Sequence, residues 1–69
     1  MRFNYSKLKQ ILDSRYIEQK ELAEAVGVSE AAVSGWCKGI KVPSLETAGR
    51  IAKFLSIAID DLVEDRDEI

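Results

Sequence analysis

Apolar residues recur along this chain at intervals of three and four, the spacing of one face of an α-helix. They predict helices over about residues 5–15, 19–26, 30–37, 45–55 and 59–64. No segment alternates between apolar and polar residues long enough to indicate a strand. The pattern therefore predicts an all-α fold of five helices. One domain spans residues 1–69, with a core over about 6–63 and an acidic tail over 64–69.

The clearest boundaries lie between residues 19 and 39. Gly27 is placed to end one short helix in the left-handed conformation, and Ser29 is placed to cap the next. Gly39 ends this second helix, and Pro43 with Ser44 marks the start of another. Two short helices joined by a turn of this length form a helix-turn-helix, with the second helix free to present a narrow face.

The composition leaves little room for enzyme chemistry. The chain has no histidine and one cysteine, so it lacks the ligands of a structural zinc site and any histidine-based catalytic pair. It also lacks a glycine-rich phosphate loop. We therefore expect neither an enzyme nor a cofactor. There is no signal peptide and no apolar run of membrane-spanning length, so the expected location is the cytoplasm.

The charge is unevenly distributed. The net charge is −2, but residues 1–41 carry seven basic and five acidic side chains, whereas residues 42–69 carry three basic and seven acidic. A face of the first part could attract a polyanion while the acidic end points away from it. An ordinary solvated surface with no such polarity is the alternative.

Several separated motifs together resemble the Cro/C1-type helix-turn-helix family of phage-repressor-like (XRE) transcriptional regulators. They are Leu8-x-x-Ile11, Gln19-x-x-Leu22-Ala23, Val26-Gly27-Val28-Ser29, Val33-Ser34-x-Trp36-x-x-Gly39, Pro43-Ser44-Leu45-x-Thr47 and Ile51-Ala52-x-x-Leu55. The resemblance implies a lambda-repressor-like domain whose recognition helix, at about 30–37, enters the major groove of double-stranded DNA. Trp36 and Val33 are expected to be core residues behind that helix.

The resemblance also implies roles for individual residues. The base-reading candidates are Glu30, Ala31, Ser34 and Gly35, all expected to face outward. The phosphate-contact candidates are Gln19, Ser29, Ala32, Lys38 and Lys41, with Lys20 and Arg15 as weaker additions. Glu30 could accept a hydrogen bond from cytosine and Ala31 could touch a thymine methyl group. Glu30 could equally serve only the helix dipole, and the lysines could be ordinary surface residues.

Three positions depart from the family pattern. Leu12 and Cys37 stand where members often carry an ion pair, so we expect them to meet in the core. A redox-active thiol at Cys37 is disfavoured, since no basic neighbour is evident. Glu18 replaces a small polar residue beside a phosphate and would repel it unless it turns away. Ala58 lacks the side-chain cap usual before the last helix, which weakens that helix.

The sequence thus favours a DNA-binding regulator acting as a two-fold dimer. By resemblance, its contacts would come from Ile57, Ile59, Leu62 and Val63, some of which must also belong to the core of the monomer, with Phe3, Tyr5 and Phe54 as exposed additions. The alternative is a protein-interaction or antitoxin-type module that uses the acidic C-terminal end to hold a basic partner. The low pI, Glu18 and the small reading face favour this second view.

Overall fold

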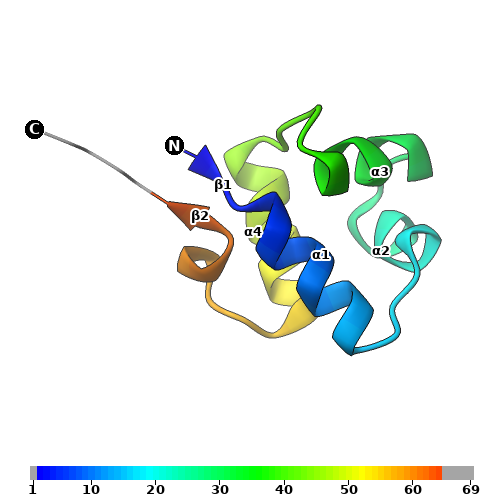
Figure 1. The fold of residues 1–69 in the computed structure, drawn as a ribbon, viewed down its shortest axis with the longest axis horizontal. Coiled ribbons are helices and arrows are strands. Elements are labelled where there is room, and N and C mark those ends of the chain that lie inside the picture. Colours follow the sequence, from blue (N-terminus) through cyan, green and yellow to red (C-terminus); the bar gives the residue numbers. More distant parts are fainter. Residues whose placement is uncertain (1, 65–69) are drawn as a thin grey trace, which may run out of the picture.

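The computed structural model describes residues 2–64 and contains four α-helices, one 3₁₀ turn and a small sheet (Figure 1). Of the expected acidic tail at 64–69, Glu64 belongs to a strand and residues 65–69 lie outside the described residues. The α-helices are α1 (Tyr5–Ser14), α2 (Gln19–Val26), α3 (Glu30–Lys38) and α4 (Leu45–Leu55). They are followed by η1 (Ile59–Asp61), and β1 (Arg2–Phe3) pairs antiparallel with β2 (Val63–Glu64).

The end of the domain differs from the predicted fold. The expected fifth helix is a single 3₁₀ turn, and its N-terminal residue Ala58 supplies no side-chain cap. The chain then extends so that Val63 pairs with Phe3. The prediction of no strands was also wrong, because two-residue strands are too short to show an alternating pattern.

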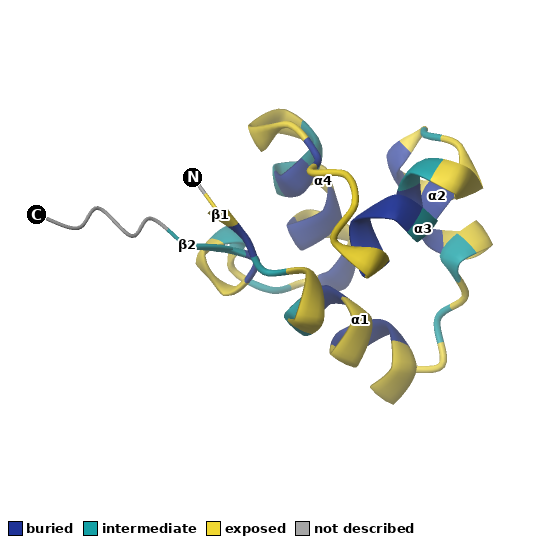
Figure 2. Ribbon diagram, turned by 45° about the horizontal axis from the view of Figure 1, so that its top comes forward, coloured by how far each residue is buried: buried dark blue, intermediate teal, exposed yellow. Residues whose placement is uncertain are grey.

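The core is built from the predicted stripes. The buried apolar residues come from β1, from all four α-helices and from the segment after η1: Phe3, Leu8, Ile11, Leu12, Leu22, Ala23, Val26, Val33, Trp36, Cys37, Ala48, Ile51, Ala52, Leu55 and Leu62. Figure 2 shows the buried sides of the helices turned toward one another, with the exposed sides outward. The core placement of Trp36 and Val33 is confirmed. Leu12 and Cys37 are both buried within this cluster, where α1 packs on α3.

Several residues expected at a dimer surface are buried or half-buried in the core of a single chain. Phe3 is buried rather than exposed, because β1 lays it on the core. Leu62 is fully buried, and Ile57, Ile59 and Val63 are half-buried against the same cluster. Little of this group is left for a partner.

The turn between α2 and α3 is short and closed by hydrogen bonds. Gly27 ends α2 with φ 78°, and its N–H and that of Val28 both donate to the Ala23 carbonyl, at 2.9 and 3.0 Å. Ser29 then caps α3 by accepting from the Ala32 N–H at 3.1 Å. The predicted roles of Gly27 and Ser29 are confirmed. A short, hydrogen-bonded turn therefore connects the two helices.

Two left-handed glycines allow a matched test of this turn chemistry. A Cβ at Gly27 would meet nothing within 4 Å, so Gly27→Ala should cost only the left-handed strain, about 1 kcal/mol. Gly39 has φ 76°, and a Cβ there would lie 3.0 Å from the Tyr5 ring. Gly39→Ala should therefore cost more. Urea unfolding of both variants measures the two losses, and equal losses would show that the Tyr5 contact is unimportant.

Candidate nucleic-acid interface

One side of α3 is free of the core and forms a continuous exposed surface. Val33, Trp36 and Cys37 take the inner side. The helical spacing then places Glu30, Ala31, Ser34 and Lys38 together on the outer side, where Ser34 is half-buried and the other three are exposed. We call these four residues the α3 face. The Ser34 hydroxyl makes no hydrogen bond within residues 2–64, so it remains available to a ligand.

Gly35 was predicted to face outward with these residues, but it is buried. The loop after α3 folds back over it: the N–H groups of Ile40 and Lys41 donate to the Gly35 carbonyl at 2.9 and 3.2 Å. A Cβ at position 35 would lie 3.0 Å from Cγ and Cδ of Lys41. The aliphatic part of Lys41 thus covers the surface that a side chain at position 35 would occupy.

This contact changes the role of Lys41. Its side chain lies against α3 and borders the α3 face, rather than extending freely from a loop. The lack of a side chain at 35 leaves room for this close contact, and the loop length brings position 41 back. Both the glycine and the loop length can be read from the sequence, but neither indicates that Lys41 is the residue that packs on Gly35.

The Ala32 amide near the start of α3 is already used. The Ala32 N–H donates to the carbonyl and the Oγ of Ser29, both at 3.1 Å, and the Ala32 methyl packs against the core. Ala32 therefore has no free donor for a phosphate, and its predicted role does not fit. Ser29 is exposed, and its hydroxyl can still donate a hydrogen bond.

The start of α2 carries two carboxylates beside Gln19. Glu18 is the residue that caps α2, and its N–H donates to Oε1 of Glu21 at 3.2 Å in a capping-box arrangement. This local role explains a glutamate at position 18. Glu21 was missed as a partner, because the usual signal begins with Ser, Thr, Asp or Asn. Gln19, the first residue of α2, is half-buried.

The two weaker basic candidates separate in the structure. Lys20 is exposed on α2 and remains available. Arg15 instead donates from Nη1 to the carbonyl of Leu55, the last residue of α4. This bond satisfies one of the free carbonyls at a helix end, so Arg15 links α1 to α4 rather than facing a phosphate.

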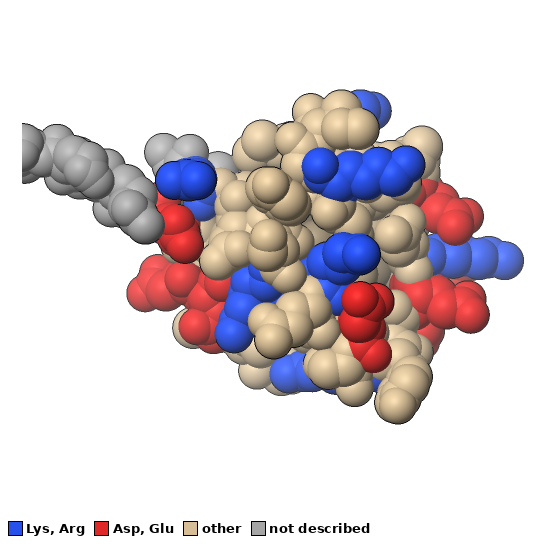
Figure 3. Space-filling model, in the orientation of Figure 1, with Lys and Arg blue, Asp and Glu red and all other residues tan. Residues whose placement is uncertain are grey.

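Basic and acidic side chains are mixed over much of the face in Figure 3: acidic groups lie on the left near η1 and β2, on the right near α2, and in the middle beside basic ones. The uppermost part, over the loop that follows α3, shows basic and uncharged atoms. The sequence between Glu30 and Glu46 indeed contains no acidic residue, and its only charged side chains are Lys38 and Lys41.

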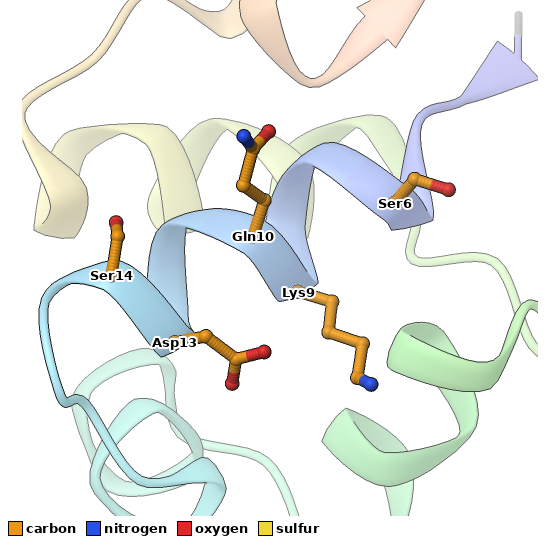
Figure 4. Close-up of a pocket in the computed structure, with 5 residues that line it drawn as sticks. All are labelled: Ser6, Lys9, Gln10, Asp13 and Ser14. Atoms are coloured by element: carbon orange, nitrogen blue, oxygen red, sulfur yellow. The ribbon is translucent and has the colours of Figure 1, made fainter.

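A shallow, open depression follows the outer side of α1. It is lined by Ser6, Lys9, Gln10, Asp13 and Ser14 (Figure 4). Lys9 and Asp13 leave one side of the helix and Gln10 leaves another, so these groups do not converge on a ligand. Within residues 2–64 no three His, Cys, Asp or Glu side chains are grouped to hold a metal ion. None of the described helices is both long and apolar enough to cross a bilayer.

Cys37 is a buried thiol below the α3 face. Burial raises the pKa of Cys37, while Lys9 lowers this pKa by a smaller amount and Asp13 adds to the rise. A basic neighbour is therefore present, contrary to the sequence-based expectation, but burial outweighs it. The protonated thiol is a poor nucleophile, so this structure does not favour redox chemistry at Cys37.

Comparison with known proteins identifies the class. A helix-turn-helix family profile matches residues 8–62, most of the chain. The chain therefore belongs to the helix-turn-helix family of the Cro/C1 (XRE) type, a family without enzymatic activity.

Its relatives carry regulatory names. The chain is 38% identical over 69 residues to the HTH-type transcriptional activator BcrR of Enterococcus faecalis, covering all of this chain and 33% of that protein. It is 35% identical over 60 residues to the cryptic phage CTXphi transcriptional repressor RstR of Vibrio cholerae, covering 87% and 54%. An uncharacterized HTH-type transcriptional regulator of Methanocaldococcus jannaschii is 37% identical over 57 residues, covering 83% and 86%. The chain thus spans a third and about half of the first two proteins.

The fold is also similar to a solved structure. The solution structure of the SOS-response transcriptional repressor LexA from Eubacterium rectale superposes with a TM-score of 0.82 at 29% identity. The match covers 94% of this chain and 69% of that one. The lambda-repressor-like fold is confirmed, with four α-helices and a two-stranded sheet in place of five helices.

The raised pKa of Cys37 gives a pH dependence. Because the folded-state pKa lies above the unfolded one, the thiol's contribution is present below the unfolded pKa, near about 8.5, and is lost at higher pH. The free energy of unfolding should fall more steeply between about pH 8 and pH 10 in the wild type than in Cys37→Ala. Urea titrations across this range measure both slopes. Parallel slopes would show that the thiol is not protected by burial.

Proposed function

We propose that this protein is a transcriptional regulator that binds specific sequences of double-stranded DNA by placing α3 in the major groove. The α3 face carries the proposal: it is a narrow, exposed side of a well-supported helix, it includes Lys38, it is bordered by Lys41, and Glu30 is its only acidic residue. Narrow helical faces of this kind fit the major groove. DNA binding and regulation are also what the names of the relatives suggest.

Base reading would rest on three small or short side chains. Glu30 can accept a hydrogen bond from a cytosine amino group, Ala31 can contact a thymine methyl group, and the free Ser34 hydroxyl can donate or accept a hydrogen bond at a base edge. None of these makes a bidentate arginine-type contact. Discrimination should therefore depend strongly on DNA shape and on bridging water.

Backbone contacts would fix the position of α3. Lys38 on the α3 face and Lys41 beside it supply positive charge, while Ser29 and the Gln19 amide supply neutral donors. Because Lys41 is held against Gly35, less side-chain freedom is lost when it meets a phosphate than for an unsupported lysine. As a two-fold dimer, the protein would place two α3 helices in successive major grooves about 34 Å apart.

The alternative, a protein-interaction or antitoxin-type module, draws on the acidic end. Asp60 and Asp61 are exposed, and Glu64 lies nearby in β2. A basic partner could bind there while the α3 face stays free. An undetectable affinity for duplex DNA at low salt would favour this second function over the first.

Salt dependence provides the direct test. Lys38→Gln and Lys41→Gln should each weaken binding to non-specific duplex, and each should lower the slope of log K against log salt by about one unit. Lys53→Gln, an exposed lysine in the last turn of α4, serves as the matched control and should change neither quantity. Fluorescence anisotropy at several salt concentrations measures the slopes. If all three variants had the same slope as the wild type, the α3 face would not be part of the DNA interface.

A substitution at Glu18 should strengthen DNA binding, whereas the lysine substitutions should weaken it. Glu18→Ser keeps a capping residue at the start of α2 but removes a carboxylate beside Gln19. Binding to non-specific duplex at low salt should tighten by up to about fivefold, since repulsion of about 1 kcal/mol is relieved. Asp60→Asn makes the same charge change far from α2 and should have a smaller effect. Equal gains from both variants would indicate only a general effect of net charge.

A further inference from the structure

Tyr16, in the turn between α1 and α2, has an unusual backbone conformation for its residue type. Within residues 2–64, Tyr16 and Ser56 are the two residues other than glycine with a positive φ, each at 57°. Glycine takes this left-handed conformation freely, whereas a residue with a Cβ is strained in it. Gly27 and Gly39 stand at the corresponding positions after α2 and α3. Compared with glycine, the tyrosine at position 16 therefore lowers the stability of the fold.

The Tyr16 side chain makes no contact within the domain that would offset this strain. It is 92% exposed, more than any other large apolar or aromatic side chain in the described part of the chain. Its hydroxyl has no hydrogen-bond partner among the same residues. Strained residues cluster where a protein binds another molecule. An exposed ring in this conformation thus indicates a contact outside the domain.

The residues on both sides of Tyr16 are held in place. The Ile17 N–H donates to the Leu12 carbonyl at 2.9 Å, the usual bond after a helix that ends in a left-handed residue. Ile17 also packs against the core. On the other side, Arg15 donates to the carbonyl of Leu55. The backbone that carries Tyr16 is therefore fixed, so less freedom is lost when its side chain meets a ligand.

The place of this turn in the fold favours DNA as the ligand. The turn leads directly to Gln19, the phosphate candidate at the start of α2. In Figure 1 the chain leaves α1 and runs up the right-hand side to α2, which packs on α3. The four charged side chains around the turn cancel to no net charge: Asp13, Arg15, Glu18 and Lys20. A contact here would thus depend on hydrogen bonding rather than on charge, and tyrosine hydroxyls are among the donors that bond DNA phosphates.

We propose that Tyr16 is a DNA-backbone contact whose hydroxyl donates a hydrogen bond to a phosphate oxygen beside the start of α2. The inference rests on the proposed function and deepens it, because it adds a neutral donor that extends the backbone contact beyond Gln19. The hydroxyl touches no base, so it strengthens binding to specific and non-specific duplexes alike. The strain at position 16 is retained because it holds this donor in a fixed place.

Two variants of Tyr16 test the contact. Tyr16→Phe removes only the hydroxyl, so affinity for non-specific duplex should fall about fivefold. Its slope of log K against log salt should equal that of the wild type, because no charge is lost. Tyr16→Gly should bind at least as weakly, yet its melting temperature should rise by roughly 4–8 °C as the strain is relieved. Fluorescence anisotropy at several salt concentrations and thermal unfolding measure these quantities.

Ser56→Gly is the matched control. It relieves the same left-handed strain after α4, so it should raise the melting temperature similarly but leave the affinity for DNA unchanged. Wild-type affinity in Tyr16→Phe, or a lower melting temperature in Tyr16→Gly, would overturn the proposal while the proposed function stands. A wild-type protein that binds no duplex at low salt would instead remove the proposed function together with this inference.

Discussion

The whole arrangement depends on the burial of one side of α3. Val33 is fully buried, and Trp36 and Cys37 are almost so. A helix of nine residues gains little stability from its own hydrogen bonds, so contact with α1 and α2 is what holds it. Because the inner side is fixed by large side chains, the opposite side is equally fixed in direction. The same apolar contacts that stabilise the domain therefore aim the four outward residues.

The ends of α3 are controlled as tightly as its inner side. Ser29 satisfies a free N–H at the start, and Gly39 reverses the chain at the end. The reversal returns the loop to the Gly35 carbonyl, so the helix, its cap and the lysine above it act as one unit. This helps to explain how so small a face can be positioned accurately: little of its surroundings can move independently.

Much of the fold could be predicted because its signals are local. The stripes of α1, α2 and α4, the left-handed Gly27 and Gly39, and the cap at Ser29 each depend on residues a few positions apart. Most of the errors lie where distant residues meet. Phe3 is buried because residues 2–3 pair with residues 63–64, and no periodicity reports a partner 60 positions away. The last predicted helix fails for a local reason, since Ala58 cannot cap it.

The candidate site shows the same division. Glu30, Ala31 and Lys38 face outward as their helical positions require, and Ser34 lies between them, half-buried. Gly35 was misplaced because its burial depends on Lys41, and Arg15 because its partner is the Leu55 carbonyl of another helix. Helical spacing predicts which side of a helix a residue occupies. It cannot predict which loop returns to cover that side.

The small sheet has a mechanical consequence. Phe3 and Val63 pair, and the Asn4 N–H donates to the Leu62 carbonyl, so the two edges of the described chain are joined beside η1. A pulling force applied at either edge would act first on two-residue strands, which are the weakest element to hold a load. Because each strand contributes only two residues, we expect this pairing to open before the longer helices do. The β1–β2 pair can thus open under tension while α2 and α3 keep their relative orientation.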